Sequence, residues 1–181
     1  MNRTEKLYGE ERRMKILELL QNSQAPITGS ELSRLTNVSR QVIVGDITLL
    51  KAMNEPIIAT SQGYLYMNTG EDRHTCERVI ACRHTPGLTE AELNLIVDSG
   101  VTVKDVKVEH PVYGDLTASI MVSNRRQVKQ FIEKMEATGA SLLSELTGGV
   151  HLHTITAATE SQLDEVIEAL KQEGFLAMDN D

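Results

Sequence analysis

Long apolar runs and disulfide-forming cysteines are both scarce in this sequence, and each scarcity excludes a class of protein. No stretch approaches the ~18 consecutive apolar residues that span a bilayer. The charged residues 1–6 are unlike a secretory signal. The two cysteines, Cys76 and Cys82, form no C-x-x-C pair and no disulfide framework. We therefore expect a cytoplasmic protein with no membrane partner, whose cysteines are small buried hydrophobes.

An excess of positive charge is also absent, because the formal net charge is −8 at pH 7. Residues 1–70 carry 8 Lys or Arg and 7 Asp or Glu, whereas the remainder carries 10 and 19. A near-neutral first part with clustered basic residues can still contact phosphates, with modest non-specific affinity. The clustered residues are Arg12, Arg13, Lys15, Arg34 and Arg40.

The length of 181 residues and the 40% hydrophobic content suggest one or two domains with buried cores. Residues 68–72 are polar and contain glycine, as linkers between domains often do. We predict an N-terminal domain over residues 1–70 and a C-terminal domain over residues 71–181.

Residues 28–51 contain two short helical patterns joined by a tight turn, which predicts a helix-turn-helix. Ser39 can accept hydrogen bonds from the backbone N–H groups that open the second helix. The start of that helix is where a recognition helix reaches base edges and phosphates. The alternative is an ordinary helical hairpin whose polar residues only face water. We expect contacts with operator DNA from Arg34, Ser39, Arg40 and Gln41.

The elements around this motif predict a winged helix-turn-helix. A supporting helix is expected over residues 9–22, and Pro56 follows the end of the recognition helix. Apolar residues at 57–60 and 64–67 flank the turn residues 61–63, which predicts a β-hairpin that forms the wing.

The C-terminal domain alternates between strand and helix patterns. This alternation predicts an α+β fold with a ferredoxin-like, split βαβ order of elements. Strands are expected at 76–83, 101–109, 116–122 and 149–157 with a short one at 175–177, and helices at 89–99, 125–137 and 160–173.

Two histidines, His151 and His153, lie two residues apart on one predicted strand. Residues so spaced point to the same side, roughly 6–7 Å apart, and both imidazoles can converge on one metal ion. His84 follows the first predicted strand, and Glu92 lies one turn into the next helix. Imidazole nitrogens with a carboxylate suit zinc, nickel or another borderline divalent ion.

Each of these residues also has an explanation that needs no metal. Residues 89–92 match a capping box, in which Glu92 would bond the backbone N–H of Thr89. The H-x-H pair can be the polar face of an amphipathic strand, and His110 before Pro111 can simply end a strand. Spacing alone leaves both interpretations open.

A resemblance to a known family rests on a biotin-repressor-like winged helix and three later motifs. These are C-R-H-T-P-G-L-T-E-A-E-L at 82–93, E-H-P-V-Y-G at 109–114 and G-G-V-H-L-H-T at 148–154. Together they resemble the nicotinate-responsive transcriptional repressors with a three-histidine domain, over nearly the whole chain. The resemblance implies a divalent metal, nickel or zinc, bound by His84, Glu92, His151 and His153, with His110 lining the pocket.

The same resemblance implies a repressor of genes for NAD precursor synthesis, salvage or nicotinate uptake, with nicotinic acid as co-repressor. We expect nicotinic acid to ligate an open position on the metal, while His110, Tyr113 or Arg83 binds its other end. The ligand would favour a homodimer that sets two recognition helices about one helical turn, or a multiple of it, apart on DNA. Gly45 departs from the family, in which a longer polar or basic side chain is frequent there.

Two rival functions use the same ligands. A metalloenzyme can activate water on such a site, with Glu109 or Asp115 as base, although no nucleophile or oxyanion motif is recognisable. A metal-responsive repressor would instead take the ion itself as its signal, with no organic effector.

Overall fold

The computed structural model describes residues 8–67 and 75–177. The chain divides into two compact units, Met1–Glu71 and Asp72–Asp181. The stretch 68–72, where a domain boundary was expected, lies outside the described residues, as do residues 1–6. Within the described part, no helix is both long enough and apolar enough to cross a membrane.

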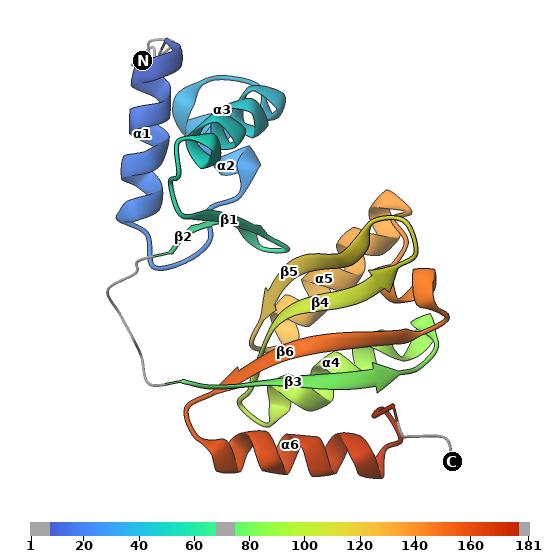
Figure 1. Ribbon diagram of the computed structural model, residues 1–181. Helices are drawn as coiled ribbons and strands as arrows, with labels where there is room; N and C mark the ends of the chain where they lie inside the picture. The colour runs from blue at the N-terminus through green and yellow to red at the C-terminus, as the bar shows by residue number, and fades with distance from the viewer. Residues whose placement is uncertain (1–7, 68–74, 178–181) are drawn as a thin grey trace. The chain divides into compact units, whose positions relative to one another are not determined.

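The first unit is a winged helix-turn-helix, which confirms the prediction (Figure 1). Thr28 begins the second helix by accepting from the backbone N–H of Glu31, and Asn37 turns the chain with a left-handed φ of 53°. Ser39 then caps the third helix by accepting from Val42 N. The elements are α1 (Gly9–Gln21), α2 (Gly29–Thr36), α3 (Arg40–Ala52), β1 (Ile57–Thr60) and β2 (Gly63–Tyr66).

An ion pair joins α1 to α3 at the edge of this unit's apolar core. Asp46 is only 3% exposed, and its Oδ2 accepts from Arg12 Nε at 2.6 Å. Arg13 approaches the same carboxylate at 3.7 Å. Arg12 and Arg13 had been counted among the residues available to phosphates, but their guanidinium groups lie against Asp46.

The second unit is a four-stranded antiparallel sheet with its three α-helices on one face, as Figure 1 shows. The core cluster holds the inward residues of the strands together with apolar residues of all three helices, such as Ile96, Val128 and Leu163. The elements are β3 (Cys76–Arg83), α4 (Thr89–Asp98), β4 (Thr102–His110), β5 (Gly114–Val122), α5 (Arg125–Thr138), β6 (Val150–Ala157) and α6 (Glu160–Gln172), with short 3₁₀ helices at Pro86–Leu88 and Leu143–Thr147.

The α+β class and the split βαβ succession of elements are confirmed. The strands lie in the order β3-β6-β4-β5, so each helical crossover skips one strand and β6 pairs on both sides. The alternation along the sequence does not determine which strands are central. The expected strand at 175–177 is reduced to a single bridge between Cys82 and Leu176, because the chain there meets only the end of the edge strand β3.

Candidate functional site

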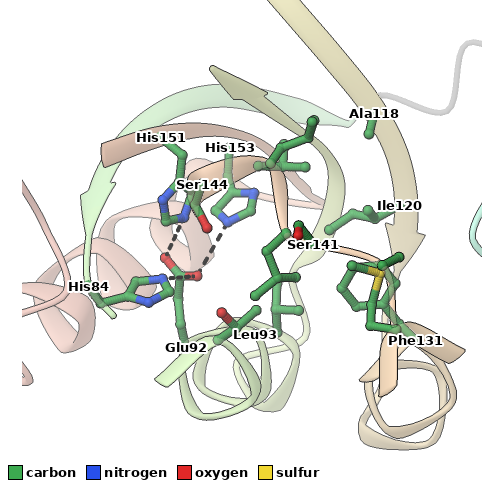
Figure 2. Close-up of a pocket in the computed structure, with 16 residues that line it drawn as sticks. His84, Glu92, Leu93, Ala118, Ile120, Phe131, Ser141, Ser144, His151 and His153 are labelled. Carbon is green, nitrogen blue, oxygen red and sulfur yellow. Dashed lines mark hydrogen bonds and ion pairs between the residues drawn. The ribbon is translucent and has the colours of Figure 1, made fainter. Parts of the chain in front are cut away.

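Three histidines and one glutamate converge where β3, β6 and α4 meet. His84 follows β3, His151 and His153 lie on β6, and Glu92 lies one turn into α4. His84 Nε2 is 2.8 Å and His153 Nε2 is 3.3 Å from Glu92 Oε2, while His151 Nε2 is 3.4 Å from Oε1. Figure 2 shows the three rings directed at the one carboxylate. We call these four residues the tetrad.

Each imidazole of the tetrad is oriented by a backbone carbonyl. His84 Nδ1 lies 2.8 Å from the oxygen of Thr85, and His151 Nδ1 lies 2.9 Å from that of Gly149. His153 Nδ1 lies 2.7 Å from the oxygen of Asp105. A carbonyl oxygen only accepts hydrogen bonds, so each Nδ1 carries the proton and Nε2 is left to bind a cation. Metal-binding histidines in proteins are held in this way.

The electrostatics of the tetrad favour a cation between the rings and the carboxylate. Glu92 is fully buried, and its Oε1 has no hydrogen-bond partner among the described residues. Burial raises the pKa of Glu92, but the neighbouring His151, His153 and His84 outweigh it and hold the pKa well below its usual range. Burial lowers the pKa of His84, and its bonds to Glu92 and to the Thr85 carbonyl raise it by more. The tetrad therefore fits a divalent metal.

The capping-box alternative for Glu92 is wrong. The residue in the N-cap position is Leu88, no side chain caps α4, and the Glu92 carboxylate is bonded to histidines. Thr89 instead places its hydroxyl in a buried position without a partner among the described residues.

Two local backbone features bring the histidines together. Gly149 has a φ of 94°, and a Cβ there would overlap the carbonyl oxygen of His84, so only glycine allows the ends of β3 and β6 to approach so closely. A register shift between Val103 and Asp105 interrupts the pairing of β4 with β6. Bulges of this kind re-aim backbone groups, and here the Asp105 carbonyl reaches the His153 ring.

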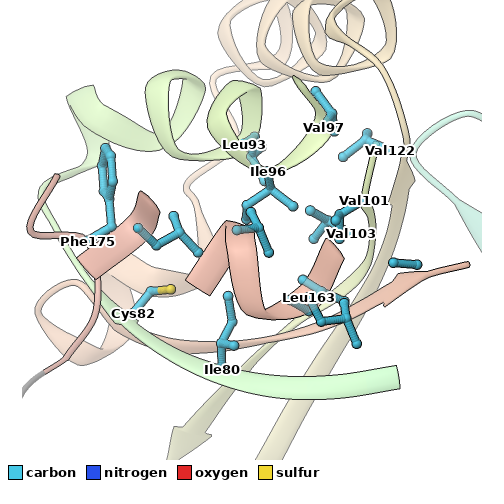
Figure 3. Packing of buried hydrophobic residues seen from close by; sticks show 14 of the residues in the cluster. Ile80, Cys82, Leu93, Ile96, Val97, Val101, Val103, Val122, Leu163 and Phe175 are labelled. Carbon is cyan, nitrogen blue, oxygen red and sulfur yellow. The ribbon is translucent and has the colours of Figure 1, made fainter. Parts of the chain in front are cut away.

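Cys82 is a further potential ligand that the sequence interpretation did not include. It is fully buried in the core cluster, near Ile80 and Phe175 in Figure 3, as expected of a small hydrophobe. Its sulfur also lies within 4.8 Å of donor atoms of Glu92 and His151. Its position two residues before His84, which directly follows β3, was the available signal, since alternate residues of an extended chain share a face.

An apolar cavity of about 180 Å³ opens beside the tetrad. In Figure 2 its walls extend from the tetrad past Leu93 to Ile120 and Phe131. Besides the tetrad, its lining comes from α4 (Thr89, Leu93), β4 and β5 (Val106, Ala118, Ile120), α5 (Phe131, Met135) and the segment that follows α5 (Ala140, Ser141, Leu142, Leu143, Ser144).

The residues expected to bind the other end of an effector do not line this cavity. Tyr113 is 75% exposed in the turn between β4 and β5. His110 stacks beside it and accepts from the backbone N–H groups of Val112 and Tyr113. Arg83 is exposed, because it points to the face of β3 opposite to Cys82. The structure therefore places these three side chains outside this cavity, and their part in effector binding stays a prediction.

The expected DNA-contacting residues lie together around the start of α3. Arg40 and Gln41 are exposed on its first turn, and Arg34 is exposed on α2. Ser39 is exposed as well, although its Oγ accepts from Val42 N at 3.4 Å. Gly45 faces open space, because nothing lies within 4 Å of a Cβ built there.

Comparisons with known proteins match both units. A 3H domain model matches residues 77–179, and an HTH domain model matches residues 12–65. The chain is 58% identical over 175 residues to the transcription repressor NadR of Bacillus subtilis, covering 96% of this chain and 97% of that relative. It is 38% identical over 171 residues to the probable transcription repressor NiaR of Thermotoga maritima, covering 94% and 96%. The matched ranges contain the helix-turn-helix and the whole tetrad.

Proposed function

The chain belongs to the family of transcription repressors that join a helix-turn-helix domain to a 3H domain, and on this premise we propose that nicotinic acid is its co-repressor. The 3H domain binds a divalent metal, zinc or nickel, through His84, Glu92, His151 and His153. The observation that carries this proposal is the orientation of the three rings, whose Nε2 atoms all face one buried carboxylate.

The metal would supply a positive charge and an open coordination position for the effector. Three imidazoles and one carboxylate leave one net positive charge on a bound divalent ion. The adjoining apolar cavity can take a small aromatic ring. A metal site without an organic ligand, as in a metal sensor, would leave this cavity without a role.

The effector acts on DNA binding by favouring one dimeric state over the others. To lock the protein on its operator, nicotinic acid must prefer that state by a few kcal/mol. In a homodimer, two copies of α3 would be set about one helical turn, or a multiple of it, apart on a palindromic site. The regulated genes would serve NAD precursor synthesis, salvage or nicotinate uptake, in the cytoplasm where bacterial DNA lies.

Calorimetric titration of nicotinic acid tests the effector and the metal together. The full chain is titrated once loaded with zinc or nickel and once after chelation, with nicotinamide as the control ligand. We expect tight binding of the acid only in the loaded protein. Equal binding after chelation would remove the metal's role, and no binding in either form would remove the effector.

A pair of histidine variants makes this test specific to the tetrad. His151→Ala removes one ligand and should abolish metal retention and the nicotinate response, while leaving the fold and weak DNA binding. His110→Ala is the comparison variant, because the His110 ring bonds to the backbone of the β4–β5 turn and does not line the cavity, and binding should be retained. Loss of binding in His110→Ala with binding retained in His151→Ala would instead indicate that the effector binds at the β4–β5 turn.

The operator sequence can be found by selecting, from a random DNA library, the fragments that the metal-loaded protein binds. These fragments then serve as the DNA in the affinity measurements. Arg40→Ala and Gln41→Ala, at the exposed start of α3, should each weaken binding roughly tenfold if they contact base edges. Arg126→Ala on α5 is the control for a lost surface charge. Fluorescence anisotropy measures the affinities, and sedimentation of the same complexes gives the number of copies bound.

A further inference from the structure

We propose that the cavity beside the tetrad binds a planar aromatic monocarboxylate in one orientation, with its carboxylate toward the metal ligands and its ring among Leu93, Ile120 and Phe131. This inference rests on the proposed function, because it assigns how the effector lies in the site. It also names the chemical class that the cavity accepts.

The charges around the cavity decide the orientation. None of its lining residues, all of which are described, is a lysine or an arginine. A carboxylate placed among the apolar walls would be a buried charge without a partner, which is strongly unfavourable. All groups of the lining that could carry or hold a positive charge belong to the tetrad, where a divalent ion would be bound. The carboxylate therefore faces the tetrad.

The walls opposite the tetrad suit an aromatic ring. Leu93 and Ile120 are almost fully buried, and Phe131 adds an aromatic surface. Figure 2 shows Ala118, Ile120 and Phe131 on the side of the cavity away from the histidines, with Leu93 between them and Glu92. A volume of about 180 Å³ accommodates a single aromatic ring with a small substituent.

Thr89 supplies a second polar group at the tetrad end. It is 8% exposed, and its Oγ1 has no hydrogen-bond partner among the described residues. It lies three residues before Glu92 on α4, so both side chains share one face of the helix. Its hydroxyl can donate to the carboxylate oxygen of the ligand that does not bind the metal. We therefore assign Thr89 as a specificity-determining residue.

The reverse orientation would place the pyridine nitrogen on the metal. Pyridine and nicotinamide share that nitrogen, and both lack the carboxylate. Benzoate, in contrast, has the carboxylate and lacks the nitrogen. The two orientations consequently predict opposite affinities for these three compounds.

Calorimetry on the zinc-loaded full chain with nicotinate, benzoate, nicotinamide and pyridine separates the possibilities. We expect benzoate to bind within roughly tenfold of nicotinate, and nicotinamide and pyridine to bind roughly a hundredfold more weakly or not at all. Tight pyridine and nicotinamide binding with no heat from benzoate would overturn the orientation and leave nicotinate as effector. Tight benzoate binding without nicotinate binding would remove the proposed effector and support the cavity assignment. No binding by any probe overturns both.

Variants test the walls and Thr89 without touching the metal ligands. Ala118→Leu fills the cavity and should abolish aromatic acid binding, while cobalt absorption shows that the metal is still bound. Thr117→Leu is the matched control, because the neighbouring residue on β5 faces the opposite side of the sheet. Thr89→Val should weaken benzoate binding roughly tenfold, and Thr89→Ser should restore it. Unchanged benzoate binding in both Ala118→Leu and Thr89→Val would refute the assignment.

Discussion

The ring of His153 donates through Nδ1 to the backbone carbonyl oxygen of Asp105 at 2.7 Å, across 48 residues of sequence. The same aspartate accepts the backbone N–H of Thr154 through its carboxylate, at 3.0 Å. One residue of β4 therefore positions both a ring of the tetrad and the backbone beside it. The register shift at this point is what makes the carbonyl available.

Asp105→Ala should weaken zinc affinity roughly tenfold, because it removes the carboxylate that holds the Thr154 backbone beside His153, although the carbonyl that bonds the ring remains. The variant leaves the Thr154 N–H without its acceptor, so the bulge and the His153 ring are less well held. Competition with a chromogenic chelator measures the affinity. Lys104→Ala is the control, since Lys104 is the preceding residue and its ion pair is with the solvent-exposed Glu77. Equal affinities for the two variants would contradict a positioning role.

Gly149→Ala should both destabilise the second unit and disable the tetrad. The added Cβ meets the His84 carbonyl, so the ends of β3 and β6 must separate, at a cost of about 3 kcal/mol. Gly148→Ala is the matched control, because its φ of 62° is strained but nothing lies within 4 Å of the new Cβ. It should cost about 1 kcal/mol and retain metal. Thermal unfolding and metal content after dialysis measure the two effects.

Cys82→Ser should leave the spectrum of the cobalt-loaded protein unchanged. Burial and the neighbouring Glu92 raise the pKa of the Cys82 thiol, which disfavours the thiolate that a metal would need. We expect no thiolate-to-cobalt charge-transfer absorption in the native protein. A near-ultraviolet band that disappears in Cys82→Ser would instead make this cysteine a fifth ligand and lower the net charge of the site.

Asp46→Ala should destabilise the first unit by about 3 kcal/mol, because it removes the buried carboxylate that Arg12 and Arg13 both contact. Asp98→Ala removes an exposed ion pair with Arg125 in the second unit and should cost less than about 1 kcal/mol. Urea unfolding of both variants compares the two pairs. Similar losses of unfolding free energy in the two variants would mean that the Arg12–Asp46 pair stabilises the protein no more than an exposed ion pair does.

The helix-turn-helix was predictable from the sequence because its determinants are local. Thr28, Asn37 and Ser39 each act on neighbouring backbone groups, and a left-handed turn between two capped helices needs no distant contact. The functions of Arg12 and Glu92 were not settled in this way. Each could contact solvent or a neighbour in sequence. Arg12 takes a partner 34 residues away, and Glu92 takes His84, 8 residues away, together with His153, 61 residues away.

The sequence by itself determined which side chains could ligate a metal, since strand alternation places His151 and His153 on one side of β6. Only the tertiary structure decided that Glu92 faces those rings instead of capping its helix, because that choice depends on three imidazoles brought in from two strands. The tertiary structure also decided where the cavity lies. The cavity walls come from segments scattered between residues 84 and 153, and packing alone determines which of their side chains enclose it.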